Sequence, residues 1–370
     1  MTSGHPAWAL PPVTPLAALE PLGEQIATNN GQSSEVARLG GSGSGAALLF
    51  KRYKSPLDHA DALRLDRLVA FGRSKAPAGR PAREVLLSRT SWPVARVTSR
   101  TSATIGCIIP MAPQAFRAPD GKFREIDTLA RPDEWLARRG THLGSGERIT
   151  ACRSLVGIAA ALEQRRLVYS DWNYANVFWT PTDYSVYLID MDSCAEDRGH
   201  DIHQTGWEDP LAPQGMPADL YTDRYRVALL AARCLTGSRA PAEVLHALGD
   251  PPLGVPRVAT ELLLDMLWAD DRKTRPRSSV LLAALHDGPV VRFTVARLPL
   301  PARPAARRGD TAAPRSSAVT RPAGSGRPVK PAVPPHPPAP PPPDTESSAA
   351  ALVALLVAVA VIALVLLLVV

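Results

Sequence analysis

Cysteine and aromatic residues are scarce in this sequence of 370 residues. The four cysteines lie far apart and show no metal-ligand spacing: Cys107, Cys152, Cys194 and Cys234. We therefore expect reduced thiols in the core of a cytosolic domain. Aromatic residues make up only 5% of the chain, but the hydrophobic content of 45% supports a real core. The length allows two domains or one large two-lobed domain.

A basic surface for nucleic acid is missing from the part of the chain that can fold. The net charge is +7, but residues 291–348 hold nine Lys or Arg against three Asp or Glu. The remainder is nearly neutral, so we expect no nucleic-acid partner. The same segment contains 15 of the 38 prolines and cannot bury a core. This composition predicts a disordered linker, partly in the polyproline II conformation.

The last 22 residues, 349–370, carry no charged or polar side chain. At about 1.5 Å per residue a helix of this length reaches about 33 Å, enough to cross a bilayer core of about 30 Å. The opening residues MTSGHPAWALPP lack the basic and apolar regions of a signal peptide. With the basic segment before the span, this predicts a cytoplasmic domain anchored in a cell membrane by one C-terminal helix. The richness in Ala, Arg and Pro is typical of a GC-rich bacterial genome.

Hydrophobic periodicity divides the rest of the chain into a β-rich and an α-rich part. Residues 1–24 are Pro-rich and are expected to form a flexible tail. Residues 25–115 contain strand-like runs and one helical run, and residues 116–290 are mostly helical. The helical runs are expected at residues 59–71, 145–166, 222–235, 242–248, 259–269 and 278–286. We expect two lobes with a cleft between them.

Three oxygen-bearing side chains interrupt two apolar, strand-like runs, VYSDWNYANVFW (residues 168–179) and LIDMDS (residues 188–193). Asn176 and Asp190 offer the amide and carboxylate oxygens that Mg²⁺ prefers beside substrate phosphates. Asp171 lies five residues before Asn176, where it can accept a proton or orient a hydroxyl. The pattern favours a phosphoryl-transfer site. The alternative is a β-hairpin with two polar turns.

The same two runs resemble the active-site motifs of the protein kinase superfamily. YSDWNYANVFW occupies the place of the catalytic loop H-R-D-x-x-x-x-N, and LIDMDS occupies the place of the D-F-G strand end. The resemblance covers residues 25–287 and is greatest to a divergent bacterial group of eukaryotic-like protein kinases. It implies an α+β, two-lobed fold, with ATP and Mg²⁺ as cofactors and a protein substrate. It also implies that Asp171 is the catalytic base and that Asn176 and Asp190 are the metal ligands.

Landmarks of a kinase nucleotide site follow in the expected order. LLFKRY resembles the strand with the ATP-binding lysine, which would be Lys51, although Lys54 is a competing candidate. NNGQSSEV resembles a glycine-rich loop with Gly31 and Val36 over the nucleotide, whereas GGSGSG is interpreted as a hairpin turn. IIPMAP resembles the hinge between the lobes, whose backbone would face adenine at three residues: Pro110, Met111 and Ala112.

Two further landmarks lie in the α-rich part. Asp223 resembles the aspartate that opens the large helix and holds the backbone of the catalytic loop, although Asp223 or Thr222 can also be a simple helix N-cap. Arg275, followed by proline, resembles the arginine near the last helices of protein kinases. Leucine replaces the glutamate of the A-P-E motif, so Arg275 would need Glu208 or Asp209 as its partner.

Several positions depart from the kinase pattern. Ser170 replaces the arginine that reads a phosphorylated activation loop, so we expect no switching by that route. Asn173 replaces the lysine that contacts the γ-phosphate in Ser/Thr kinases. The helical run HADALRLDRLVAF has no glutamate to pair with Lys51, and Asp66 is its only plausible substitute. Asp192 replaces the glycine of D-F-G and is expected to bind a second metal or a backbone amide.

Three functions are compatible with these residues. The first is a membrane-anchored protein kinase, of the serine/threonine type, that transfers the γ-phosphate of ATP to a protein hydroxyl. The second is a kinase-like scaffold, or pseudokinase, that binds nucleotide without catalysis. The third is a small-molecule phosphotransferase, which Asp223, Arg275 and the membrane anchor disfavour.

The predicted anchor has a testable topology. A reporter fused after Val370 should be detected outside the cytoplasm, because the basic linker is expected to keep the preceding domain inside. Fusions before and after residues 349–370 can be compared in bacterial cells with a reporter that is active only outside the cytoplasm. A cytoplasmic signal from the fusion after Val370 would contradict the anchor.

Overall fold

A computed structural model describes residues 10–28, 33–40, 47–74, 81–251, 254–291 and 294–299. All of these residues lie in one compact unit, residues 1–306. No helix in the described ranges is long and apolar enough to cross a membrane. The predicted span at 349–370, most of the predicted linker, residues 41–45 of the GGSGSG turn and Gly31 lie outside the described residues.

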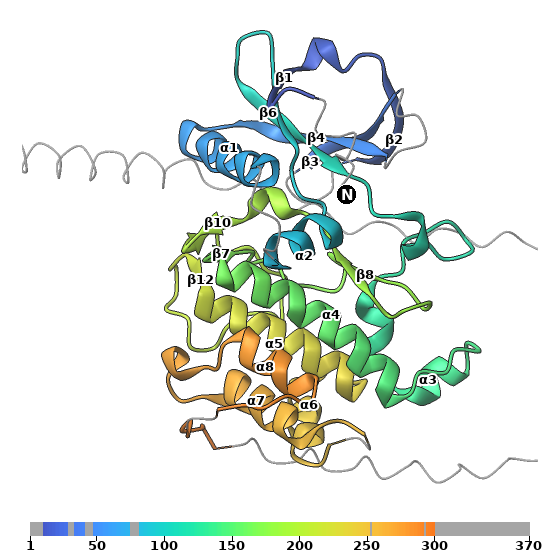
Figure 1. Cartoon of the computed structure of the whole chain (residues 1–370), viewed down its shortest axis with the longest axis vertical. Coiled ribbons are helices and arrows are strands. Elements are labelled where there is room, and N and C mark those ends of the chain that lie inside the picture. Colours follow the sequence, from blue (N-terminus) through green and yellow to red (C-terminus); the bar gives the residue numbers. More distant parts are fainter. Residues whose placement is uncertain are drawn as a thin grey trace, which may run out of the picture. The chain divides into compact units, whose positions relative to one another are not determined.

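The first lobe is a six-stranded sheet with the strand order β1-β5-β6-β4-β3-β2 (Figure 1). Only the β1–β5 pair is parallel. The strands are β1 (Val13–Pro15), β2 (Leu22–Thr28), β3 (Ser33–Leu39), β4 (Leu48–Leu57), β5 (Ala95–Thr98) and β6 (Thr104–Pro110). Short 3₁₀ turns lie at Leu16–Ala18, Gln114–Phe116, Ile126–Ala130, Met191–Ser193 and Arg272–Thr274.

The prediction of a flexible tail at residues 1–24 is wrong for the part that the structure describes, residues 10–24. Strand β1 pairs with β5, with Val13 opposite Arg96, and β2 begins at Leu22. Thr14 and Leu19 are buried, because this segment covers the outer face of the sheet. Its prolines are compatible with a strand at the edge of a sheet, where a missing N–H breaks no ladder.

Side chains of β4 alternate between the two faces of the sheet, as the strand period requires. Leu48 and Phe50 pack in a cluster on the outer face, together with residues of β5 and β6. Leu49 and Tyr53 pack on the opposite face against helix α1 (His59–Arg73). Lys51 lies between Leu49 and Tyr53 in the sequence, so it projects from the α1 side of the sheet.

Helix α2 (Pro81–Arg89) was not expected from the sequence, and it lies against the helical lobe rather than the sheet (Figure 1). Its buried side chains, Ala82 and Leu86, belong to the large helical core. Trp92, just after α2, donates its indole N–H to the carbonyl of Leu68 in α1 at 2.8 Å. The segment therefore ties α1 to the second lobe within residues that we had assigned to the first.

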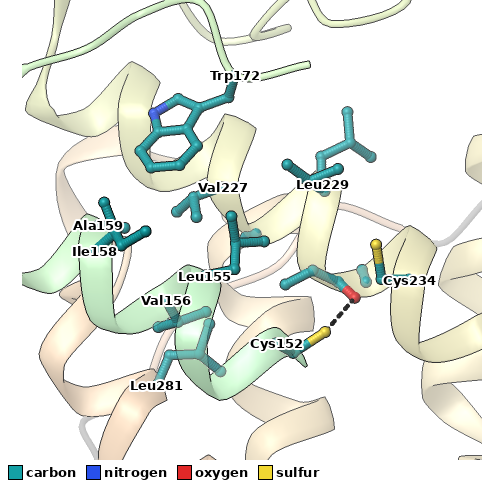
Figure 2. Packing of buried hydrophobic residues seen from close by; sticks show 14 of the residues in the cluster. Cys152, Leu155, Val156, Ile158, Ala159, Trp172, Val227, Leu229, Cys234 and Leu281 are labelled. Carbon is teal, nitrogen blue, oxygen red and sulfur yellow. Dashed lines mark hydrogen bonds between the residues drawn. The ribbon is translucent and has the colours of Figure 1, made fainter. Parts of the chain in front are cut away.

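The second lobe is helical and is built around the long helix α4. Its helices are α3 (Asp133–Ala137), α4 (Ser145–Gln164), α5 (Leu220–Thr236), α6 (Pro241–Gly249), α7 (Arg257–Trp268) and α8 (Ser278–Leu285). Leu155 of α4 and Val227 of α5 face each other in the core, and Cys152 donates its thiol to the carbonyl of Ala231 (Figure 2). All four cysteines are buried free thiols, as expected.

Three short antiparallel pairs lie on the helical lobe and face the sheet lobe. They are β7 (Leu167–Val168) with β10 (Ala195–Glu196), β8 (Val177–Trp179) with β9 (Val186–Leu188), and β11 (Arg198–Gly199) with β12 (Ala218–Asp219). β8 and β9 form a hairpin, with Val177 opposite Leu188. The loops before β8 and after β9 carry the polar residues that the sequence singled out.

Candidate active site

Lys51 lies in the middle of β4, where its ammonium group reaches the second lobe. Its Nζ is 3.0 Å from Oδ1 of Asp190 and 2.9 Å from Oδ1 of Asp192. Burial alone would lower the pKa of Lys51, but these two carboxylates outweigh it and raise the pKa. The neighbouring strand approaches closely at Gly106, where a Cβ atom would lie 2.3 Å from the carbonyl oxygen of Lys51. A glycine is therefore required beside the lysine.

Asp171 is held by the side-chain amides of two asparagines. Asn173 donates to its Oδ1 at 2.8 Å, and Asn176 donates to its Oδ2 at 2.8 Å. The oxygen of the Asn173 amide accepts from the backbone N–H groups of Ala175 and Asn176, which closes the loop. Burial raises the pKa of Asp171, and the hydrogen bonds from the asparagines offset part of that increase. Asn173 therefore shapes the loop at the position where a kinase lysine would contact phosphate.

Asp190 lies close to this loop in an unusual backbone conformation. Its φ of 59° is left-handed, which is uncommon for a residue other than glycine and is found at functional sites. The N–H of Ile189 donates to the backbone carbonyl of Asn176 at 2.9 Å, so the segments that carry Asn176 and Asp190 lie side by side. The Asp190 side chain keeps 37% of its surface exposed although it contacts Lys51.

Asn176 and Asp190 fit a magnesium site chemically. Asn176 commits its amide nitrogen to Asp171, which leaves its amide oxygen as the atom that can bind a metal. Asp190 adds a partly exposed carboxylate. Mg²⁺ is commonly held by one or two such oxygens together with substrate phosphates and water. In the described part of the chain, no cluster of three or more His, Cys, Asp or Glu side chains could hold a metal ion.

Asp223 holds the backbone just before Asp171, in the loop that resembles a kinase catalytic loop, as expected. Its carboxylate accepts from the N–H groups of Tyr169 and Ser170 at 2.7 and 2.8 Å. Burial raises the pKa of Asp223 to about 6, although both hydrogen bonds oppose the increase. The alternative role as a helix N-cap falls to Asp219, which accepts from Tyr221 and Thr222 at the start of α5.

Arg226 is a site residue that sequence reasoning missed. Its guanidinium is buried and donates to the carbonyl of Ser170 at 2.9 Å, to that of Trp207 at 3.0 Å and to Asp201 at 2.6 Å. It thus joins the catalytic loop to the segment after Asp190. A signal existed, because Arg226 follows Asp223 by three residues on one helix face and therefore points the same way.

Arg275 has the partner that was expected from the A-P-E departure. Its two terminal nitrogens lie 2.6 and 2.7 Å from the carboxylate oxygens of Asp209. Both side chains are fully buried. Bidentate geometry makes this the strong type of arginine–carboxylate pair. Glu208, the other candidate, instead accepts a hydrogen bond from the backbone N–H of Gly206.

The expected adenine-facing segment is partly committed to the sheet. Met111 donates its N–H to the carbonyl of Ala47 at 2.8 Å, and Pro110 has no N–H. Ala112 is buried in a small cluster with Phe116. Val36 lies opposite Lys51 in the β3–β4 register, on the side of the sheet that faces α1. The backbone N–H of Met111 is therefore not available to donate a hydrogen bond to an adenine base.

Solved structures offer one informative comparison. The chain matches a structure described as "ROP18 kinase domain in complex with AMP-PNP and sucrose", with a TM-score of 0.50 and 17% sequence identity. The match covers 72% of this chain and 78% of the other. This protein has a protein-kinase-like fold. The predicted two-lobed α+β architecture is therefore confirmed, although no family model and no curated protein matches the sequence.

The kinase-like fold differs from the sequence expectation at the partner of Lys51. Asp66, the expected substitute on α1, pairs with Arg96 at 2.7 Å and not with Lys51. Asp192, which we expected at a second metal or a backbone amide, supplies the contact instead. Sequence spacing could not show this, because it does not reveal which face of α1 meets the lysine.

Replacing Arg226 should loosen the catalytic loop and the segment after it. Arg226→Lys keeps the charge but cannot reach Ser170, Trp207 and Asp201 at once. We expect a loss of about 2–4 kcal/mol in unfolding free energy, because buried acceptors lose charged donors. Hydrogen exchange at residues 170–172 and 201–207 should accelerate. Arg224→Lys is the control on the same helix, since Arg224 contacts Glu163 and not this loop; equal exchange in the two variants would contradict the role.

Proposed function

We propose that this protein is an ATP-dependent protein kinase that transfers the γ-phosphate of ATP to a serine or threonine hydroxyl. The observation that carries the proposal is the meeting of Lys51 with Asp190 across the two lobes. These residues are 139 positions apart in the chain, and they meet beside a loop that presents Asp171 and Asn176. A nucleotide bound there would have a cation, metal-binding oxygens and a base within one cleft.

Each residue has a distinct role in the proposed reaction. Lys51 binds the α- and β-phosphates, and Asn176 and Asp190 hold Mg²⁺, which would neutralise charge on the phosphates. Asp171 accepts the proton of the substrate hydroxyl while the oxygen of that hydroxyl bonds to the γ-phosphorus. The bond from that phosphorus to the bridging oxygen of ADP breaks in the same displacement. Positioning by the two asparagines keeps Asp171 oriented for this transfer.

A nucleotide-binding pseudokinase is the second candidate, and one observation favours it. Asn173 stands where a kinase lysine would contact the γ-phosphate, and both ends of its amide are used within the loop. The transferring phosphate therefore lacks one cation, which should reduce the transfer rate. A small-molecule phosphotransferase is less well supported, because Asp223 and Arg275 make the contacts expected of protein kinases. From the sequence alone we also propose attachment to a bacterial cell membrane through residues 349–370.

Catalysis and nucleotide binding can be separated with one substitution. The purified chain with Mg²⁺ and labelled ATP should label itself or a generic protein acceptor. Asp171→Asn should reduce the label at least about 100-fold, because a general base typically contributes 10²–10⁴-fold. The same variant should keep the ATP-dependent rise in melting temperature. Asp183→Asn, in the exposed turn of the β8–β9 hairpin, is the control and should label normally.

The outcomes discriminate between the candidates. Label in the wild type that is no higher than in Asp171→Asn, together with an ATP-dependent thermal shift, would favour the pseudokinase. The absence of any thermal shift with ATP would contradict both.

The pH dependence of the reaction should report on Asp171. The carboxylate must be ionised to accept a proton, so the rate should fall as the pH drops through its pKa. Because burial raises that pKa above the ordinary 3.8, the fall should begin at a higher pH than for an exposed aspartate. Asn173→Ala removes a hydrogen bond to the ionised form, so it should move the fall to still higher pH. The measurement is kcat/KM against pH, and an acid limb at or below 3.8 would contradict the assignment.

A further inference from the structure

Two carboxylates of one tight turn contact Lys51, and they differ in exposure. The Asp190 side chain is 37% exposed, whereas that of Asp192 is 6% exposed. Asp190 is therefore accessible to a metal ion. Asp192 is buried behind it, and the ammonium group of Lys51 at 2.9 Å is its charged partner. The two acids are therefore suited to different tasks.

Helix α1 contributes no carboxylate to Lys51. It contains two acidic residues, and both are engaged elsewhere. Asp61 contacts Arg64 and lies 3.4 Å from His200, and Asp66 contacts Arg96. The α1 residues that pack in the cluster containing Tyr53 and Cys107 are apolar, the buried Leu65 and Val69.

We propose that Asp192 is the positioning residue for Lys51, and that it holds the lysine from the turn after the metal-binding strand instead of from helix α1. The inference rests on the proposed function only in taking Lys51 as the group that binds nucleotide phosphates. When Asp190 binds a metal, Asp192 keeps the ammonium group in place. A lysine with a single partner would otherwise lose its orientation on metal binding.

The position of α1 follows from the same turn. Arg64 of α1 donates to the carbonyl of Asp192 at 2.6 Å and to that of Cys194 at 3.1 Å. Its contacts with this turn are to backbone carbonyls and do not involve the Asp192 carboxylate. A displacement of α1 would therefore break the contacts of Arg64 and leave the Lys51–Asp192 pair intact. The lysine is set by the turn, and α1 is attached to that turn separately.

The test is a double-mutant cycle on the full-length chain, with Mg-ATP affinity measured by calorimetry and stability by thermal unfolding. Asp192→Asn should weaken Mg-ATP binding by about tenfold or more, because the lysine loses the buried one of its two carboxylate partners. The matched control Asp66→Asn removes an α1 carboxylate that pairs with an arginine, and it should bind Mg-ATP like the wild type. Lys51→Met should weaken binding at least as much as Asp192→Asn does.

The cycle decides whether Asp192 acts through Lys51. Adding Asp192→Asn to Lys51→Met should cause no further loss of affinity, since coupled residues are non-additive. It should also raise the melting temperature above that of Lys51→Met alone, because the single variant leaves a buried carboxylate without its partner. Additive losses of affinity, or equal losses in Asp192→Asn and Asp66→Asn, would overturn the proposal.

The test still decides if Asp192→Asn does not fold or if the wild type does not bind Mg-ATP. If Asp192→Asn does not fold, the comparison of Lys51→Met with the double variant still decides, and a double variant less stable than Lys51→Met overturns the proposal. If the wild type binds no Mg-ATP, the proposed function fails, whereas the melting temperatures still test the buried pair.

Discussion

The structure depends on one buried ion pair that bridges its two lobes. Lys51 of the sheet meets Asp190 and Asp192 of the helical lobe, and the lysine and Asp192 are almost completely buried. Two charges removed from water must satisfy each other, so this contact fixes how strand β4 and the turn after β9 are placed. The glycine at 106 exists because the neighbouring strand must approach the lysine. The contact between the lobes is therefore made by charge as well as by packing.

A second set of contacts fixes the backbone of the loop before Asp171. Helix α5 presents Asp223 and Arg226 on one face, and they bind the donors and the acceptor of the Tyr169–Ser170 backbone. Asp223 accepts hydrogen bonds from two backbone N–H groups, and Arg226 donates one to a backbone carbonyl. Both the donors and an acceptor of this backbone segment are therefore fixed. Asp171 then needs only its two asparagine neighbours to fix the direction of its carboxylate.

The sequence predicted those features that depend on local pattern. Alternating strands and helical periods located the lobes, and the resemblance to kinase motifs located Lys51 and Asp171. The A-P-E departure left Glu208 and Asp209 as candidate partners of Arg275, and the structure selects Asp209. It did not predict contacts that depend on how elements face each other. The pairing of Asp66 with Arg96, the burial of Asp192 and the reach of Arg226 follow from helix rotation and lobe packing. Strand β1 was missed because proline obscured its short edge pattern.

One departure from the kinase pattern is matched by a contact elsewhere in the structure. Helix α1 has no acid for Lys51, and Asp192, at the position of the D-F-G glycine, contacts the lysine instead. Arg226 does not replace the arginine absent at Ser170 in this way, because it donates to the backbone carbonyl of Ser170 and to Asp201 within the helical lobe. The lysine therefore keeps a buried carboxylate partner without an acid on α1. Asn173 is different, because it fills the place of a phosphate-binding lysine with a side chain that only orders the loop. In the proposed reaction, Lys51 and a metal held by Asn176 and Asp190 would have to neutralise the γ-phosphate without a third cation.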